Sequence, residues 1–194
     1  MLKGKFRGLL SLTSLFLLCV AIAIGFHLTF SQQSVSAERV KPSAAAKEIP
    51  NRLIDYDKFL AQAQIVGKLR SKRRVSEAEF LRLAAKPGTV ILDARSTERY
   101  QDLHIQGAKH LSFPDITADA LAKIIPSKTS MILIYCNNNF LNEPIAFASK
   151  MPSASLNINT FNTLYSYGYE NIYELGPLLD ARTTKLPLVS DRKR

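Results

Sequence analysis

The chain has 194 residues, 46% of them hydrophobic, with ten Phe, seven Tyr and a formal net charge of +10. This length suffices for one ordinary domain plus a targeting segment, and the apolar content can supply a core. Together these values exclude disordered and collagen-like chains, and the two cysteines exclude a disulfide-rich scaffold.

Residues 1–37 have the layout of a secretory signal. A cationic start precedes an apolar run, residues 9–30, that contains no charged side chain, and the small residues Ser36-Ala37 follow. One alternative is therefore a signal peptide that is cleaved before Glu38. The other is an uncleaved anchor that contacts the membrane through residues 9–30, because a run of 22 residues can span a bilayer. Both alternatives predict an exported protein, periplasmic or anchored with its domain on the non-cytoplasmic side, since basic flanks stay in the cytoplasm.

The mature chain is still basic. Removal of residues 1–37 takes away three cations and no anion, which leaves a net charge of +7. Part of this excess lies in the run 68–74 and part in residues 192–194. We interpret the first run as a solvated helix end, because neither interleaved aromatic residues nor a nucleic-acid motif accompanies it. No nucleic-acid partner is therefore expected.

Residues 38–74 are predicted to form a tether followed by a helix. Residues 38–50 mix charged, small and Pro residues without a lasting apolar period, which is typical of a tether. Over residues 53–69 the apolar positions recur at helical spacing, which predicts an amphipathic helix. A domain over residues 75–180 and a basic tail over residues 181–194 complete the predicted organisation.

Within the domain, apolar runs of strand length alternate with helical patterns. Ser76 and Glu79 form a capping box at the start of the first helix, and Lys86-Pro87-Gly88 ends it. The alternation predicts an α/β fold with a mainly parallel central sheet and helices on both faces. The expected strands cover residues 89–92, 107–111, 130–136 and 171–175, and the expected helices cover residues 77–85, 97–103, 118–125, 143–150 and 160–167.

Cys136 is the only cysteine of the mature chain, because Cys19 lies in the targeting segment. It ends an apolar run that fits a parallel strand buried on both faces, and open α/β sheets place ligand sites at this end of their strands. The consecutive asparagines of the following loop, residues 137–142, suit a tight curl whose N–H groups converge on one point. Such donors and a helix N-terminus favour a thiolate, which predicts a reactive Cys136. The alternative is a buried thiol that acts as a small hydrophobe.

Four fragments of the sequence, in the right order, resemble the rhodanese-like family. They are the strand with Asp93-Ala94-Arg95, the stretch 98–108, the strand that ends at Cys136, and residues 164–175. The resemblance covers about residues 75–179. It implies an α/β domain in which a cysteine after the central strand, here Cys136, carries a persulfide sulfur between a donor and an acceptor. The binding loop that it implies consists of Asn137, Asn138, Asn139, Phe140, Leu141 and Asn142.

This loop departs from the family in its charge. Family loops often carry an Arg that holds an oxyanion, whereas residues 137–142 contain no cation and the sixth position is Asn142. The departure disfavours phosphatase chemistry, because phosphoryl transfer needs positive charge on the equatorial oxygens, and it removes the expected anchor for thiosulfate. The long separation between Cys136 and Gly168 predicts an inserted segment over the site, residues 151–159.

Asp93 and Arg95 are predicted to form a structural charge pair near the site. His104 and His110 are predicted to be scaffolding residues, because no cluster of Cys or carboxylate residues has the spacing of metal ligands. We therefore expect neither a metal nor a cofactor.

Three functions stay open on the sequence alone. The first is an exported sulfurtransferase that takes sulfur from a donor and passes it to a thiol acceptor. The second is a non-catalytic rhodanese-like module near the membrane that binds a protein partner through its loop face, and the missing loop Arg favours it. The third is redox sensing through an intermolecular disulfide of Cys136.

Overall fold

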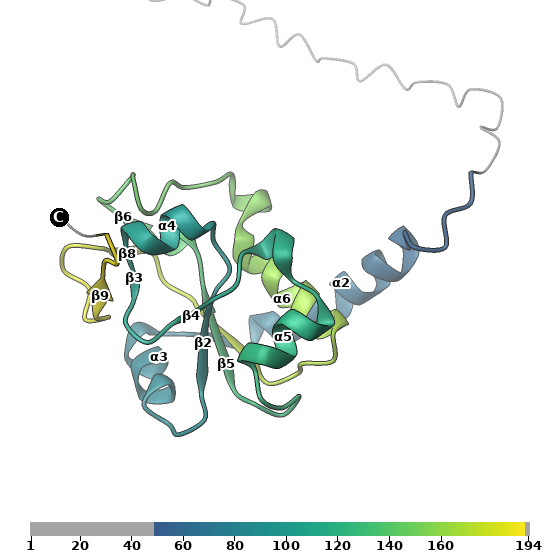
Figure 1. Ribbon diagram of the computed structural model, residues 1–194, viewed down its shortest axis with the longest axis horizontal. Coiled ribbons are helices and arrows are strands. Elements are labelled where there is room, and N and C mark those ends of the chain that lie inside the picture. Colours follow the sequence, from purple (N-terminus) through teal and green to yellow (C-terminus); the bar gives the residue numbers. More distant parts are fainter. Residues whose placement is uncertain (1–48, 193–194) are drawn as a thin grey trace, which may run out of the picture. The chain divides into compact units, whose positions relative to one another are not determined.

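A five-stranded parallel sheet forms the centre of the protein (Figure 1). The computed structural model describes residues 49–192. The strands lie in the order β1-β7-β5-β2-β4, and every neighbouring pair is parallel. Their bounds are β1 Arg74–Val75, β2 Val90–Asp93, β4 Lys109–His110, β5 Ile132–Tyr135 and β7 Ile172–Leu175.

Helices cover both faces of this sheet because its central strands are apolar on both sides. Ile132 and Ile134 of β5 pack with residues of α2, α5 and α6, whereas Leu133 and Tyr135 pack with residues of α3 on the other face. The predicted α/β fold with a mainly parallel sheet is thereby confirmed. The helices are α2 Tyr56–Ser71, α3 Glu77–Ala84, α4 Thr97–Asp102, α5 Ala118–Ile124 and α6 Leu156–Ser166.

Two pairs of short strands join the chain's later segments to the domain. Strand β3 (His104–Ile105) pairs antiparallel with β9 (Leu188–Val189), and β6 (Phe140–Leu141) pairs parallel with β8 (Leu179–Asp180). Leu186, just before β9, is buried in the core cluster that also contains Phe80 and Leu83 of α3. The described part of the region expected as a basic tail therefore packs on the domain.

The helix predicted over residues 143–150 is wrong. One turn occupies residues 144–147, and only the 3-10 helix Pro152–Ala154 follows before α6, which begins four residues earlier than predicted. Two carbonyl groups that such a helix would use internally, and two more in its last turn, accept hydrogen bonds from side chains elsewhere in the chain. The carbonyls of Ile145, Ala146, Ala148 and Lys150 accept from Arg99, Arg95, Asn137 and Asn138, respectively.

Asn142, expected as the cap of that helix, has a left-handed backbone with a φ of 66°. Its side-chain amide donates to the carboxylate of Asp180 at 2.7 Å and so reaches β8. The asparagine thus turns the chain after β6 and does not begin a helix.

Within residues 49–192, no helix is long and apolar enough to cross a bilayer. The predicted signal or anchor helix, residues 1–37, and most of the tether lie outside the described residues.

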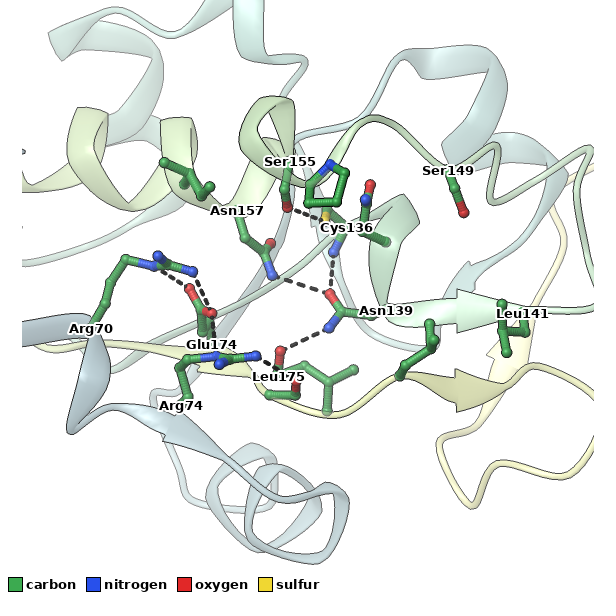
Figure 2. A pocket seen from close by; sticks show the side chains of 15 residues that line it. Arg70, Arg74, Cys136, Asn139, Leu141, Ser149, Ser155, Asn157, Glu174 and Leu175 are labelled. Atoms are coloured by element: carbon green, nitrogen blue, oxygen red, sulfur yellow. Dashed lines mark hydrogen bonds and ion pairs between the residues drawn. The ribbon is translucent and has the colours of Figure 1, made fainter. Parts of the chain in front are cut away.

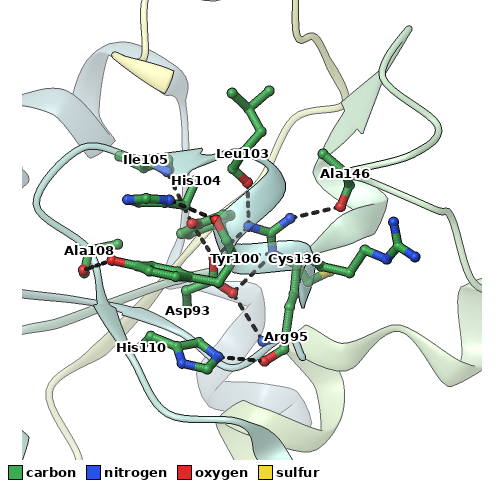
Figure 3. A network of polar contacts seen from close by, with 12 residues as sticks. Asp93, Arg95, Tyr100, Leu103, His104, Ile105, Ala108, His110, Cys136 and Ala146 are labelled. Atoms are coloured by element: carbon green, nitrogen blue, oxygen red, sulfur yellow. Dashed lines mark hydrogen bonds and ion pairs between the residues drawn. The ribbon is translucent and has the colours of Figure 1, made fainter. Parts of the chain in front are cut away.

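Asp93, at the end of β2, forms a fully buried ion pair with Arg95 (Figure 3). Arg95 Nη2 lies 2.6 Å from Asp93 Oδ2, and the guanidinium also donates to the carbonyls of Ala146 and Leu103 at 2.9 and 2.7 Å. The Tyr135 hydroxyl of β5 donates to the same carboxylate. Burial, together with the charge of Asp93, raises the pKa of Tyr135 well above its ordinary value, so the phenol keeps its proton. The pair therefore joins β2, β5 and the segment after β6.

Replacing Arg95 by Met is expected to lower the free energy of unfolding by about 3–5 kcal/mol, because it leaves the Asp93 carboxylate buried without its cation. Urea unfolding of the full chain at neutral pH measures this. Arg82→Met is the matched control, since its ion pair with Glu79 is exposed and its loss should not be measurable. Equal effects of the two substitutions would contradict a stabilising role for the buried pair.

Candidate functional site

Cys136 lies directly after β5, at the carboxyl end of the central strand (Figure 2). Its side chain is fully buried, with 0% of its surface exposed. The Cys136 N–H donates to Asn139 Oδ1 at 2.9 Å, and Sγ lies 3.5 Å from the hydroxyl oxygen of Ser155. Ser155 precedes α6, so the sulfur lies beside the amino end of that helix. The predicted helix N-terminus is thus supplied by α6 and not by residues 143–150.

The loop after Cys136 is tightly curled at its start and extended after it. Residues 137–139 form a single 3-10 turn, and β6 follows at once. The N–H groups of Asn139 and Phe140 bond to the carbonyls of Cys136 and Asn137. The Asn139 N–H is also paired with the Cys136 side chain in a capping box, so a backbone donor of the turn faces the sulfur.

The three asparagine side chains hold the turn to its surroundings. Asn137 donates to Ala148 O at 2.8 Å, and Asn138 both donates to Lys150 O and accepts from Lys150 N. Because a side-chain amide carries donors and an acceptor, each asparagine can bridge segments that lack regular structure. These bonds fasten the segment before α6 alongside the cysteine turn.

Asn139 makes the most contacts of the three and is buried. Its Oδ1 accepts from Cys136 N at 2.9 Å and from Asn157 Nδ2 at 3.1 Å, and its Nδ2 donates to the carbonyl of Leu175 at 2.8 Å. A second, longer bond reaches the carbonyl of Pro177. One amide therefore links the ends of β5 and β7 with the first turn of α6.

A pocket of about 470 Å³ opens beside the sulfur. Cys136, Ser155 and Asn157 line one part of it, and Arg70 and Arg74 line another. Pro152 and Ile158 also line it, so the segment predicted to lie over the site, residues 151–159, does border the pocket. The Oδ1 of Asn157 is buried and has no hydrogen-bond partner among the described residues, which leaves an acceptor at the pocket wall.

The cations of this pocket come from outside the cysteine loop. Arg70 of α2 makes two hydrogen bonds to the Glu174 carboxylate, at 2.6 and 2.7 Å, and Arg74 of β1 lies 3.0 Å from it. Glu174 itself is 2% exposed. Two guanidinium groups thus share one carboxylate, and this corner of the pocket keeps a net positive charge. Arg70 is only 22% exposed and is therefore not simply part of a solvated helix end, whereas Arg74 keeps 54% of its side chain exposed.

A buried glutamate was the missed signal for this arrangement. Glu174 lies inside the apolar strand pattern of β7, and a carboxylate in such a strand needs a cation beside it. Strand β1 pairs with β7, which brings Arg74 opposite Glu174 in register. The pairing of a basic run with this strand could have been inferred from the charge alone.

Ser155 differs from the cap residues of the other α-helices between residues 49 and 192. Asp55, Ser76, Ser96 and Thr117 each accept a hydrogen bond from a backbone N–H in the first turn of their helix. Ser155 makes no such bond to α6, and its hydroxyl contacts Cys136 Sγ instead. A capping bond contributes about 1 kcal/mol to helix stability, so α6 forgoes this contribution while its cap residue faces the sulfur.

A second pocket, of about 520 Å³, lies on the other side of the cysteine turn. Arg95, Arg99 and Lys150 line it, together with Asn137, whose buried Oδ1 has no hydrogen-bond partner in the described part of the chain. Sequence reasoning missed Arg99 and Lys150.

The described residues contain no group of three or more His, Cys, Asp or Glu side chains that could hold a metal ion. His104 and His110 both pack against the ring of Tyr100, with ring centroids 3.8 and 4.7 Å apart. Both histidines therefore belong to an aromatic cluster.

A sequence model of the rhodanese-like domain family matches residues 76–176. No curated protein matches the chain. Among solved structures, the chain is similar to the rhodanese-like domain of an Anabaena sp. protein, with 21% identity and a TM-score of 0.42 over 61% of this chain and 79% of that one. It is also similar to an E. coli rhodanese, with 21% identity and a TM-score of 0.37 over 53% of this chain and 98% of that one. A thiosulfate sulfurtransferase from Pseudomonas aeruginosa is similar with 16% identity and a TM-score of 0.45 over 70% of this chain and 24% of that one.

Asn139→Ala is expected to lower the free energy of unfolding by about 1–3 kcal/mol or more. The reason is that it leaves the Cys136 N–H and the Leu175 carbonyl buried without partners. Chemical denaturation measures this. The neighbouring Asn138→Ala is the matched control and should cost less than about 1 kcal/mol, since water can replace its exposed bonds to Lys150. A larger loss in the control would show that Asn139 does not organise the site.

Proposed function

Because the chain belongs to the rhodanese-like family, we propose that Cys136 carries a persulfide sulfur from a sulfane donor to a thiol acceptor. One observation carries the proposal. The Cys136 thiol, the Ser155 hydroxyl and two arginines border the same pocket at the carboxyl end of the central strand, and the hydroxyl makes no capping bond to α6. Ligand sites of open α/β sheets lie at this end.

The chemistry requires no oxidant. The Cys136 thiolate attacks the outer sulfur of the donor, and an S–S bond forms at Cys136 as the donor's own bond to that sulfur breaks. The donor's remainder leaves with the electron pair. An acceptor thiolate then attacks the outer sulfur of the persulfide, and Cys136 leaves again as a thiolate.

The surroundings suit an anionic donor. Arg70 and Arg74 together exceed the charge of Glu174, so an anion that enters the pocket meets a net positive wall. The Ser155 hydroxyl can donate to negative charge on the cysteine sulfur, and the amino end of α6 favours the same charge. In this proposal, Arg70 of α2 and Arg74 of β1 supply the positive charge that residues 137–142 lack.

Incubation of the full chain with sulfane donors is expected to add one sulfur atom, and a thiol acceptor should remove it. Intact-mass spectrometry measures both steps. Cys136→Ser should abolish the adduct, and Cys19→Ser is the matched control that should retain it, since these are the chain's two cysteines. If no donor adds sulfur to the folded wild-type chain, Cys136 is not a sulfur carrier.

Arg74→Gln is expected to raise KM for an anionic donor about two- to fivefold, because a partly exposed charge acts on the ligand through a solvent-screened interaction. KM for an uncharged organic polysulfide should not change. Lys72→Gln removes an exposed charge from the same basic run and should leave both values unaltered. Equal changes for the charged and the uncharged donor would exclude an electrostatic role for Arg74.

The complete burial of the sulfur favours a second candidate, a binding module in which Cys136 only packs beside Ser155. In that case a thiol reagent labels Cys136 only after unfolding, and Cys136→Ser has the cellular phenotype of the wild type. Labelling of the folded chain at a rate that depends on pH would favour the carrier over the module.

We also propose that the chain is exported, on the layout of residues 1–37. Amino-terminal sequencing of the protein from cell fractions tests this. A chain that begins at Glu38 outside the cytoplasm supports a cleaved signal, whereas an intact chain in the membrane fraction supports an anchor. Recovery of the intact chain from the cytosol would overturn export.

A further inference from the structure

The first half of α2 and the residues just before it expose a cluster of apolar side chains. Seven of the eleven exposed large hydrophobic residues of the described chain fall within residues 49–65. Leu53, Tyr56, Phe59 and Leu60 are 85%, 66%, 46% and 44% exposed. The rings of Tyr56 and Phe59 stack with their centroids 6.1 Å apart. We call these four residues the α2 patch.

The patch continues a helix face that is buried further along. Val66 is 3% exposed, and Gln62 bonds to Asn162 and Ser166 of α6. Phe59 precedes Val66 by two helical turns and therefore lies on the same side of α2. Figure 1 shows α2 extending past the other helices of the domain at its amino end. Within residues 49–192, the four side chains of the patch keep between 44% and 85% of their surface exposed.

Positive charge is concentrated in the same part of the chain. Residues 49–74 contain seven Lys and Arg against two Asp, whereas residues 75–194 contain thirteen Lys and Arg against twelve Asp and Glu. The domain after β1 is therefore almost neutral, and the excess lies with α2 and β1. Five of these seven cations lie in residues 68–74, whereas residues 52–60, which hold the α2 patch, contain two cations and two Asp. A helix with an apolar patch towards one end and a basic segment at the other fits an anionic lipid surface.

The preceding sequence keeps the patch within reach of a bilayer. The uncharged apolar run ends at residue 30, which leaves 22 residues before Leu53. A random coil of 22 residues has a root-mean-square span of about 25 Å. A chain held in the membrane by residues 9–30 would therefore present α2 to the bilayer surface at high effective concentration.

We propose that the first half of α2 docks onto an anionic bilayer, with the α2 patch in the boundary between headgroups and acyl chains. This inference rests on the proposed membrane attachment through residues 9–30. The other end of α2 carries Arg70, about 16 Å along the helix from Phe59. Docking would therefore hold the Cys136 pocket close to the membrane surface, where a membrane-associated donor or acceptor could reach it.

The absence of tryptophan from the chain allows a direct test. In Phe59→Trp, the new indole is the only one and reports the surroundings of the patch. The full chain is reconstituted into vesicles of zwitterionic lipid with or without anionic lipid, and emission is recorded with and without brominated acyl chains. Ile145→Trp is the matched control, since Ile145 is 70% exposed and lies outside α2. Tyr56→Trp replaces the first probe if Phe59→Trp does not fold.

With anionic vesicles, emission from Phe59→Trp should shift to the blue and fall about twofold with brominated lipid, because interfacial helices bury their apolar face at acyl-chain depth. High salt should reduce both effects, and Ile145→Trp should show neither. If the chain floats with the vesicles but its α2 probe is not quenched, the docking proposal is overturned while the anchor stands.

If the chain does not float with vesicles at all, the attachment through residues 9–30 and the docking fail together. A blue shift that grows with protein concentration and is insensitive to bromine would mean that a second copy covers the patch, which also overturns the proposal. Sulfur addition to Cys136 is measured separately, so the outcome for the proposed transfer is independent of these results.

Discussion

The site depends on one side-chain amide, that of Asn139. Its oxygen accepts from the backbone of Cys136 and from Asn157, and its nitrogen donates to the backbone after β7. Parallel strands end at the same edge of a sheet but leave their last polar groups without ladder partners. Asn139 fills that gap between β5 and β7, and this fixes the cysteine against the first turn of α6. An aspartate of the same size would lack the donor for the two carbonyls.

Charge at the site follows from a second constraint, the burial of Glu174. A carboxylate that is 2% exposed must be compensated, and Arg70 and Arg74 approach it from two different elements. The compensation exceeds one charge, and the surplus faces the pocket. The same contacts tie the carboxyl end of α2 to β7, so the helix that supplies the cations is also fastened to the sheet by them.

The elements that follow local rules could be predicted from the sequence. Strand β5 is an uninterrupted apolar run, and Ser76 caps α3 by the expected bond, so both were located within a residue or two. The sheet's parallel order and the position of Cys136 at its edge follow from those strands. The helix expected after Asn142 does not form, and two carbonyls that it would use internally, those of Ile145 and Ala146, accept from Arg99 and Arg95, which lie far away in sequence. Local propensity contains no information about such distant donors.

The chemistry around Cys136 could be predicted only in part for the same reason. The cysteine and its strand are local features, whereas its hydroxyl partner Ser155 lies 19 residues later and its cations lie more than 60 residues earlier. Residues 137–142 contain no cation, as the sequence shows, but the folded pocket does contain cations, those of Arg70 and Arg74. The positive charge is present, but it is carried by elements whose approach depends on the topology of the sheet.

Burial of the sulfur and sulfur transfer are compatible only if the wall of the pocket opens. Residues 151–155, which follow the part held by Asn137 and Asn138, are best suited to move, because their own backbone bonds, Ala154 N to Met151 O and Ser155 N to Pro152 O, span only three residues each. Since Ser155 does not cap α6, the helix loses no capping bond when the serine moves away from the sulfur. The persulfide would then be protected from water when the segment is closed and reachable when it is open. If Cys136 served packing alone, it would not need a hydroxyl beside its sulfur. Ser155 could then cap α6, as the cap residues of the four other α-helices do.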